Sequence, residues 1–136
     1  MAGETDLNTL LGTLVPKLND GVFVFTTLSQ SDIPQGLSPI MSFQEAEGTT
    51  LILLQSDAQS HNIDYEFPSR LITLDIHSSL EAVGFMAVIA TALAKEDMGV
   101  NPVSGFYHDH LFVPDGRQDD AMRILTELAK SAGKKA

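Results

Sequence analysis

Apolar and polar positions follow two spacings along the chain, one typical of helices and one typical of strands. After Asp6, leucines recur on one side at helical spacing, at positions 7, 10, 11 and 14. We therefore expect a helix with Asp6 as its N-cap, ending near Pro16, because proline disfavours the helical conformation in the residue before it. Residues 22–27, 41–45 and 51–54 have strand patterns, and residues 57–62 allow only a short helix.

The pattern becomes clearer after Pro68 and Ser69, which we take as the boundary between two domains, residues 1–68 and 69–136. Residues 70–77 alternate as in a strand. One side of that strand carries Ile72, Leu74 and Ile76, and the other carries Thr73, Asp75 and His77.

A helix is expected directly after this strand. Ser78 and Glu81 have the spacing of a capping box, and the apolar run predicts a helix to about Glu96, which Gly99 terminates. Two short strands follow at residues 103–106 and 110–113, joined tightly through residues 107–109. A last amphipathic helix has its apolar stripe at positions 121, 124, 125 and 128.

The order of these elements predicts an α+β fold. The second half has the order β-α-β-β-α, and the first has roughly α-β-β-β with a weak helix. Each resembles a ferredoxin-like βαββαβ unit that lacks one element. We therefore expect two ferredoxin-like halves that complete each other's antiparallel sheets, with helices packed on one face.

Charge and composition narrow the classes of partner. The formal net charge is −10, with only 8 Lys and Arg, which argues against nucleic acid as a partner. Residues 1–69 hold nine carboxylates and one base (−9 + 1 = −8), and residues 70–136 hold nine and seven (−9 + 7 = −2). This asymmetry favours cationic ligands or partners, although a solvated acidic surface is the simpler interpretation.

Two further features bear on cellular location and chemistry. The absence of cysteine excludes disulfides, thiolate metal sites and a cysteine nucleophile. The N-terminus carries Glu4 and Asp6 instead of a basic segment, so we expect no signal peptide and a cytoplasmic protein.

The expected helix around residues 80–94 is apolar on nearly every side, since only Glu81 and Thr91 are polar there. It is too short to span a bilayer, which needs about 20 residues, so we expect no membrane partner. Such a helix must be covered on more than one face. The cover is either a second subunit, which predicts a homo-oligomer such as a dimer, or the rest of the monomer.

Gly84 falls inside the first turns of that expected helix, where glycine costs about 1 kcal/mol relative to alanine. Close packing of helix and strand would explain it. Alternatively, the missing side chain leaves room for a ligand against the backbone. The amides of Ser79, Leu80 and Glu81 could then hold a carboxylate at the helix start.

Three segments of the second half together resemble the ACT-domain family: residues 79–85 (SLEAVGF), 99–101 (GVN) and 107–114 (YHDHLFVP). More narrowly, the chain is similar to small bacterial tandem-ACT proteins of uncharacterised function and to the regulatory regions of aspartate kinases. The resemblance implies regulatory binding of a small molecule, most often an amino acid. It also implies that the ligand lies between two modules, against the loop that joins the first strand to the first helix.

Carried over by position, that loop is His77 to Gly84, and the strand start that faces it is Asn101 to Val103. The resemblance therefore implies the following ligand-binding residues: His77, Ser78, Ser79, Leu80, Glu81, Ala82, Val83, Gly84, Asn101 and Val103. We expect backbone contacts from residues 79–83 and a side-chain contact from Asn101. Glu81 either meets a ligand amine or caps the helix. The first half has no comparable glycine-opened helix, so a symmetric second site is not implied.

Residues that could support catalysis or metal binding have simpler structural explanations. His108 and His110 share one strand face and could converge on a metal, but a third ligand is not evident. We favour a turn stabilised by Asp109 with two exposed histidines. Asp75 and His77 could form a base and its orienting partner beside two serines, but no Gly-x-Ser-x-Gly pattern accompanies them.

The sequence therefore predicts no catalytic residue, no metal site and no cofactor. We expect a non-enzymatic regulatory or sensor protein that binds a small molecule, with any regulated partner on a separate chain. The alternative is a dimerisation or protein-interaction module without a ligand. A metal-dependent or hydrolytic enzyme is the third class.

Overall fold

A computed structural model describes residues 6–76 and 83–134 of the chain. The chain forms two compact units. Unit 1 comprises residues 1–19 and 70–136, and unit 2 comprises residues 20–69, so unit 2 is an insertion in the sequence of unit 1. The division into residues 1–68 and 69–136 remains a prediction for the two sequence modules. In the structure, residues 1–19 belong to unit 1, the unit that also contains residues 70–136 of the second sequence module.

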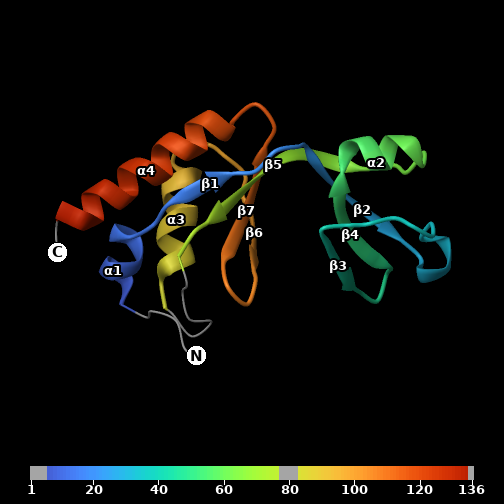
Figure 1. Ribbon diagram of the computed structural model, residues 1–136, viewed down its shortest axis with the longest axis horizontal. Coiled ribbons are helices and arrows are strands. Elements are labelled where there is room, and N and C mark those ends of the chain that lie inside the picture. Colours follow the sequence, from blue (N-terminus) through green and yellow to red (C-terminus); the bar gives the residue numbers. More distant parts are fainter. Residues whose placement is uncertain (1–5, 77–82, 135–136) are drawn as a thin grey trace. The chain divides into compact units, whose positions relative to one another are not determined.

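The described elements are shown in Figure 1. In chain order they are α1 (Leu7–Gly12), β1 (Pro16–Leu18), β2 (Phe23–Leu28), the 3-10 helix η1 (Gln30–Asp32), β3 (Met41–Gln44), β4 (Thr49–Leu54), α2 (Gln55–Ser60), β5 (Glu66–Leu74), α3 (Phe85–Ala94), β6 (Asn101–Ser104), β7 (Asp109–Pro114) and α4 (Gln118–Lys134).

Unit 1 has a sheet in the order β1-β5-β7-β6, with helices against one face. Ile72 and Leu74 of β5 and Leu111 and Val113 of β7 belong to a buried cluster with side chains of α1, α3 and α4. The alternation expected from residue 70 onward therefore assigns Ile72 and Leu74 to the correct, buried face of the sheet. Read from β5, the unit has the ferredoxin-like order β-α-β-β-α, and β1 is its last strand.

The strand β1 is the element that the second half of the sequence lacks. Pro16 pairs with Leu74 and Leu18 pairs with Ile72 in an antiparallel ladder. The Asn19 side-chain amide extends the connection by donating to the carbonyl oxygen of Leu71 (3.1 Å) and to Oγ1 of Thr73 (3.0 Å). The expectation that halves complete each other's sheets is confirmed for unit 1.

Unit 2 has antiparallel strands in the order β3-β4-β2-β5, to which β5 contributes its first residues. Val24, Leu51, Leu53 and Ala58 form its buried cluster beneath α2. Residues 29–40, with η1, occupy the place of the first helix of a ferredoxin-like unit. The expected α+β class, with two ferredoxin-like units, is thus confirmed.

Several expected boundaries are wrong. The helix expected from Ser78 begins at Phe85 instead, and it ends at Ala94. Asp97, at φ +56°, adopts the left-handed conformation after it, and Gly99 does not. Strand β5 runs through Pro68 and Ser69 and ends at Leu74. The apolar face of α3 needs no second subunit as its cover, because Phe85, Ile89 and Leu93 are buried in the core of unit 1.

Candidate functional site

Most of the expected ligand loop lies outside the described residues. This applies to His77, Ser78, Ser79, Leu80, Glu81 and Ala82, and to any capping box formed by Ser78 and Glu81. Of the remaining expected residues, Val83 is 83% exposed and Gly84 is the N-cap of α3. Asn101 is exposed at the start of β6, and Val103 is half-buried on the same strand.

Gly84 is required by its backbone conformation. Its φ of +87° lies in the left-handed region, which side chains other than glycine rarely adopt. Space is not the reason, because an added Cβ would lie 3.6 Å from Cδ2 of Leu7, an ordinary contact. Gly84 is an N-cap without a side chain. It therefore offers no side-chain oxygen to accept hydrogen bonds from the N–H groups of the first turn of α3. That turn therefore presents donors at the positive end of the helix dipole.

The strand register places Asn101 and Val103 on the sheet face opposite the helices of unit 1. Asn101 pairs with Phe112 and Val103 pairs with His110, whereas the intervening residue Leu111 is part of the core. Directly paired residues of an antiparallel ladder point to the same face. We call this the far face of unit 1; Phe112 is buried on it and Asn101 is exposed.

An ion-pair network surrounds Asp75 on this face. Nζ of Lys17 lies 2.8 Å from Oδ2 of Asp75, and Nε2 of His108 lies 3.9 Å from Oδ1. The hydrogen bond from Lys17, followed by its charge, holds the pKa of Asp75 below its ordinary value of 3.8. The expected pairing of Asp75 with His77 lies outside the described residues, so Lys17 and His108 are the partners that sequence reasoning missed.

His108 also contacts the chain where the expected ligand loop begins. Its Nδ1 lies 3.1 Å from the carbonyl oxygen of Ile76, and in the Nδ1–H tautomer it donates to that oxygen. Ile76 is the last described residue before residue 77. The hairpin of β6 and β7 is therefore attached to the entrance of that loop.

His110 and His108 are half-buried, so the expectation of two exposed histidines is wrong. Nδ1 of His110 lies 3.1 Å from Oγ1 of Thr73. Burial, followed by the charge of His108, lowers the pKa of His110 below its ordinary value of 6.5. The hairpin turn itself runs from Gly105 to His108, whose backbones are hydrogen-bonded at 2.8 Å, and Asp109 begins β7.

Metal chemistry gains no support from these contacts. Within residues 6–76 and 83–134, no group of three or more His, Asp or Glu side chains is placed to hold a metal ion. None of the described helices is both long and apolar enough to cross a bilayer.

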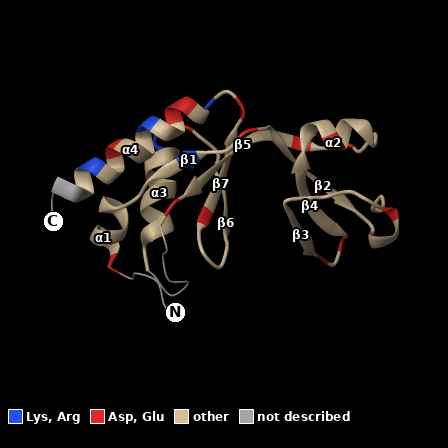
Figure 2. Ribbon diagram, viewed as in Figure 1, with Lys and Arg blue, Asp and Glu red and all other residues tan. Residues whose placement is uncertain are grey.

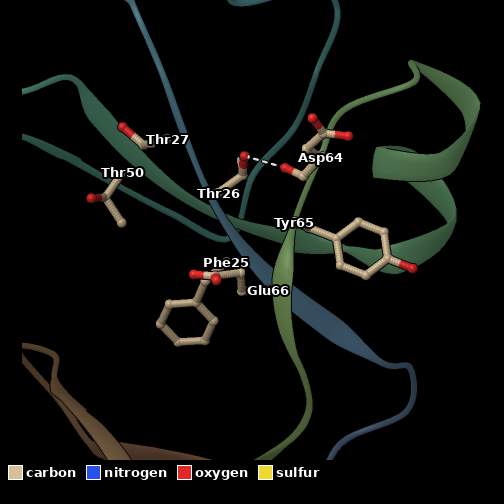
Figure 3. Close-up of a pocket in the computed structure, with 7 residues that line it drawn as sticks. All are labelled: Phe25, Thr26, Thr27, Thr50, Asp64, Tyr65 and Glu66. Carbon is tan, nitrogen blue, oxygen red and sulfur yellow. Dashed lines mark hydrogen bonds between the residues drawn. The ribbon is translucent and has the colours of Figure 1, made fainter.

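Unit 2 carries an open pocket of about 530 Å³ that the sequence did not reveal. Figure 3 shows the seven residues that line it: Phe25, Thr26, Thr27, Thr50, Asp64, Tyr65 and Glu66. They come from β2, from β4 and from the segment that enters β5. The sequence signal that could have indicated it is the carboxylate pair Asp64 and Glu66 in a stretch without any base.

Two ferredoxin-like units, one inserted in the sequence of the other and each with helices on one sheet face, define a tandem ferredoxin-like protein. The model of the ACT domain matches the chain twice, over residues 2–70 and over residues 66–127. The chain therefore belongs to the ACT-domain family, whose domains are regulatory, non-catalytic modules.

Solved structures agree with this assignment. A Vibrio cholerae protein of unknown function, described as a "Possible Transport Protein", is 40% identical over 90% of this chain and 95% of its own, with a TM-score of 0.82. An Agrobacterium tumefaciens protein is 17% identical over 85% and 89%, with a TM-score of 0.67. The regulatory subunit of aspartate kinase from Thermus flavus is 10% identical over 94% and 99%, with a TM-score of 0.59. The last two likenesses concern the fold alone. No protein with a curated description matches the chain.

Proposed function

We propose that the chain is a regulatory protein that binds an amino acid or a close analogue and has no catalytic activity of its own. The proposed site lies in unit 1, at the loop from residue 77 to Gly84 and the start of β6. The observation that carries this proposal is the left-handed Gly84 at the N-terminus of α3, since this N-cap residue supplies no side chain to the first-turn N–H groups. A ligand carboxylate fits these donors, and Asn101 supplies a side-chain amide.

A thermal-shift panel of the twenty amino acids and related metabolites tests this proposal. A ligand at about 100 times its Kd should add about 2.7 kcal/mol to the free energy of unfolding. Backbone amide NMR signals of Val83, Gly84, Asn101 and Val103 should shift with the same ligand. Asn101→Ala should weaken binding, whereas Asn8→Ala, an exposed asparagine of α1 in the same unit, should leave it unchanged. If no compound raises the melting temperature, the chain is not this kind of sensor.

A second candidate is a dimerisation module that needs no ligand. It is favoured by exposed apolar side chains at the outer strand β3 of unit 2, where Ile40 is 51% exposed and Phe43 is 65% exposed. An exposed strand edge can pair with a second chain. A homodimer and a cytoplasmic location are also part of our proposal; the first rests on the exposed apolar side chains at β3, and the second on the acidic N-terminal sequence.

Sedimentation of the full chain, read together with the ligand panel, separates the two candidates. Phe43→Lys should dissociate a dimer that uses β3 and leave ligand shifts at Val83 and Asn101 in place. If the chain sediments as a dimer and no ligand is found, the second candidate replaces the first.

A further inference from the structure

The strand β3 leaves one edge of unit 2 unpaired. Among the described residues, β3 pairs with β4 on one side and with no strand on the other. The turn after it closes with two reciprocal backbone hydrogen bonds between Glu45 and Gly48, of 3.0 and 3.3 Å. The side to which the backbone bonds alternates along a strand. Phe43, two residues earlier, therefore also bonds toward β4, and the N–H and C=O groups of Ser42 and Gln44 point to the unpaired edge.

This edge lacks the features that usually keep an exposed strand from pairing. Natural sheets protect their edges with lysine, proline or inward-pointing charges. The sequence of β3, MSFQ, contains none of them, and residues 42–44 are all exposed. Phe43 is 65% exposed, and Ile40, directly before the strand, is 51% exposed. An added strand would satisfy the outward backbone groups and cover the Phe43 ring.

The charge of unit 2 determines which chain fits this edge. Residues 20–69 contain seven carboxylates and neither lysine nor arginine, so all eight cationic side chains of the chain belong to unit 1. Figure 2 shows the same division, with red but no blue on the elements of unit 2. Glu45 and Glu47 lie in the turn that follows β3, and both are exposed. A basic segment would be attracted to the edge, whereas an acidic one would be repelled.

A second copy of the chain fits the β3 edge less well than a basic segment does. Pairing of β3 with β3 would bring two acidic units together, each with seven carboxylates and no lysine or arginine. Such a like-charge contact opposes association. A second copy is therefore the weaker occupant of this edge, and a basic segment should displace it.

We propose that the β3 edge binds an extended basic segment of another protein, which adds a strand to unit 2. In recognition by strand addition, main-chain hydrogen bonds give affinity and side chains give specificity. Ser42 and Gln44 supply the main-chain groups, and Phe43 packs against an apolar side chain of the segment. Lysine or arginine of the segment meets the carboxylates of unit 2. As the docking surface for a regulated partner the edge rests on the function proposed above, whereas the pairing itself does not.

Titration of the full-length, nitrogen-15-labelled chain with a synthetic peptide tests the proposal. The peptide has about seven residues, a usual strand length, with valine and threonine alternating between terminal lysines, and its matched control has glutamate in place of lysine. Saturable amide shifts are expected at Ser42, Phe43 and Gln44 with the lysine peptide, at concentrations up to about 1 mM. Added salt should weaken this binding. Signals of Val83 and Asn101 report on the amino-acid site, so failure of either proposal is recognised separately.

Backbone variants show whether the peptide pairs with the edge. Ser42→Pro removes an outward N–H group without breaking a bond to β4 and should raise the Kd by at least about ten-fold. Ser42→Ala keeps that N–H group and should change the Kd by less than about two-fold. Gln44→Pro repeats the test at the other outward position if Ser42→Pro disturbs unit 2, which the amide signals of Val24 and Leu53 report. Unchanged binding to a folded proline variant would overturn the proposal.

The identity of the occupant is tested on the wild-type chain. The glutamate peptide should bind at least about ten-fold more weakly than the lysine peptide, and equal binding of the two would overturn the charge requirement. The lysine peptide should also dissociate any dimer that Phe43→Lys dissociates, as measured by sedimentation. A dimer that Phe43→Lys dissociates and the lysine peptide leaves intact would assign the edge to a second copy and overturn the proposal.

Discussion

At the scale of single residues, the backbone conformation of Gly84, and not close packing, explains why a glycine occupies this position. Gly84→Ala should lower the free energy of unfolding by about 1–2 kcal/mol, because alanine resists the left-handed conformation at φ +87°. Urea denaturation followed by circular dichroism measures the change. Gly99→Ala is the matched control, since Gly99 has open space and no positive φ, and it should be neutral or slightly stabilising. A neutral Gly84→Ala would contradict the assigned conformation.

Two titrating residues on the far face of unit 1 affect stability in separate pH windows. The pKa of His110 is lowered in the folded state, so below its ordinary value of 6.5 the unfolded chain takes up a proton that the folded chain resists. Stability should therefore fall as the pH decreases through 6.5. Urea denaturation at several pH values should show His110→Gln losing part of this decrease. His61→Gln, at an exposed position after α2, serves as its control.

Asp75 affects the stability of the fold at lower pH than His110 does. Its folded-state pKa is also lowered, and for a carboxylate this gives stability that is present above 3.8 and lost as the pH falls through the folded-state value. Asp75→Asn should reduce the acid sensitivity below pH 3.8, to which Asp6 also contributes, and leave the slope near pH 6.5 unchanged. A variant that alters both windows equally would show that the two residues are not independent.

At the scale of elements, the segment of α1 and β1 should be part of the core of unit 1. Leu10 is 1% exposed in that core, so Leu10→Ala should cost about 2–5 kcal/mol. Leu18→Ala, on the 36% exposed leucine of β1, should cost less than about 1 kcal/mol. Hydrogen exchange should show the loss of protection at amides of β7 and α4, which lie in unit 1. If hydrogen-exchange protection were lost only in unit 2, the assignment of α1 to unit 1 would be wrong.

The sequence predicts elements well where the pattern is local. Ile72 and Leu74 alternate with Thr73 and Asp75 as a strand requires, and the structure confirms both faces. The three residues of β1 carry no such signal, because Pro16 alone is an equally good sign of a helix end. That strand is specified by its partner Leu74, 58 positions along the chain (74 − 16 = 58).

The candidate sites were predictable to different degrees for the same reason. Gly84 and Asn101 stay predictions from resemblance to a family. The helix start at Phe85 depends on a single left-handed residue, which a capping-box spacing does not reveal. The unit 2 pocket joins Thr26 to Asp64, which lie 38 positions apart. Pairing across a sheet, and not local pattern, brings them together.

At the scale of the whole molecule, the insertion of unit 2 into unit 1 makes a test of folding. A fragment of residues 69–136, cut at the boundary that the sequence suggests, contains residues 69–74 of β5 together with α3, β6, β7 and α4 but lacks α1 and β1. It therefore leaves one edge of β5 unpaired and removes Leu10, Leu11 and Leu14 from the core. We expect the fragment alone to be unfolded or aggregated, by circular dichroism and one-dimensional NMR.

Adding a synthetic peptide of residues 1–19 should restore a folded unit 1, because the peptide supplies both the missing strand and the missing apolar helix face. The matched control is the same peptide with Leu10→Ala and Leu11→Ala, which keeps the strand residues of β1 but removes two buried side chains. If residues 69–136 fold without any peptide, the N-terminal segment is dispensable, and the modules predicted from the sequence are also the folding units. If only the native peptide restores the fold, the folding unit is discontinuous in sequence, and any ligand that stabilises unit 1 must also tighten the binding of this peptide.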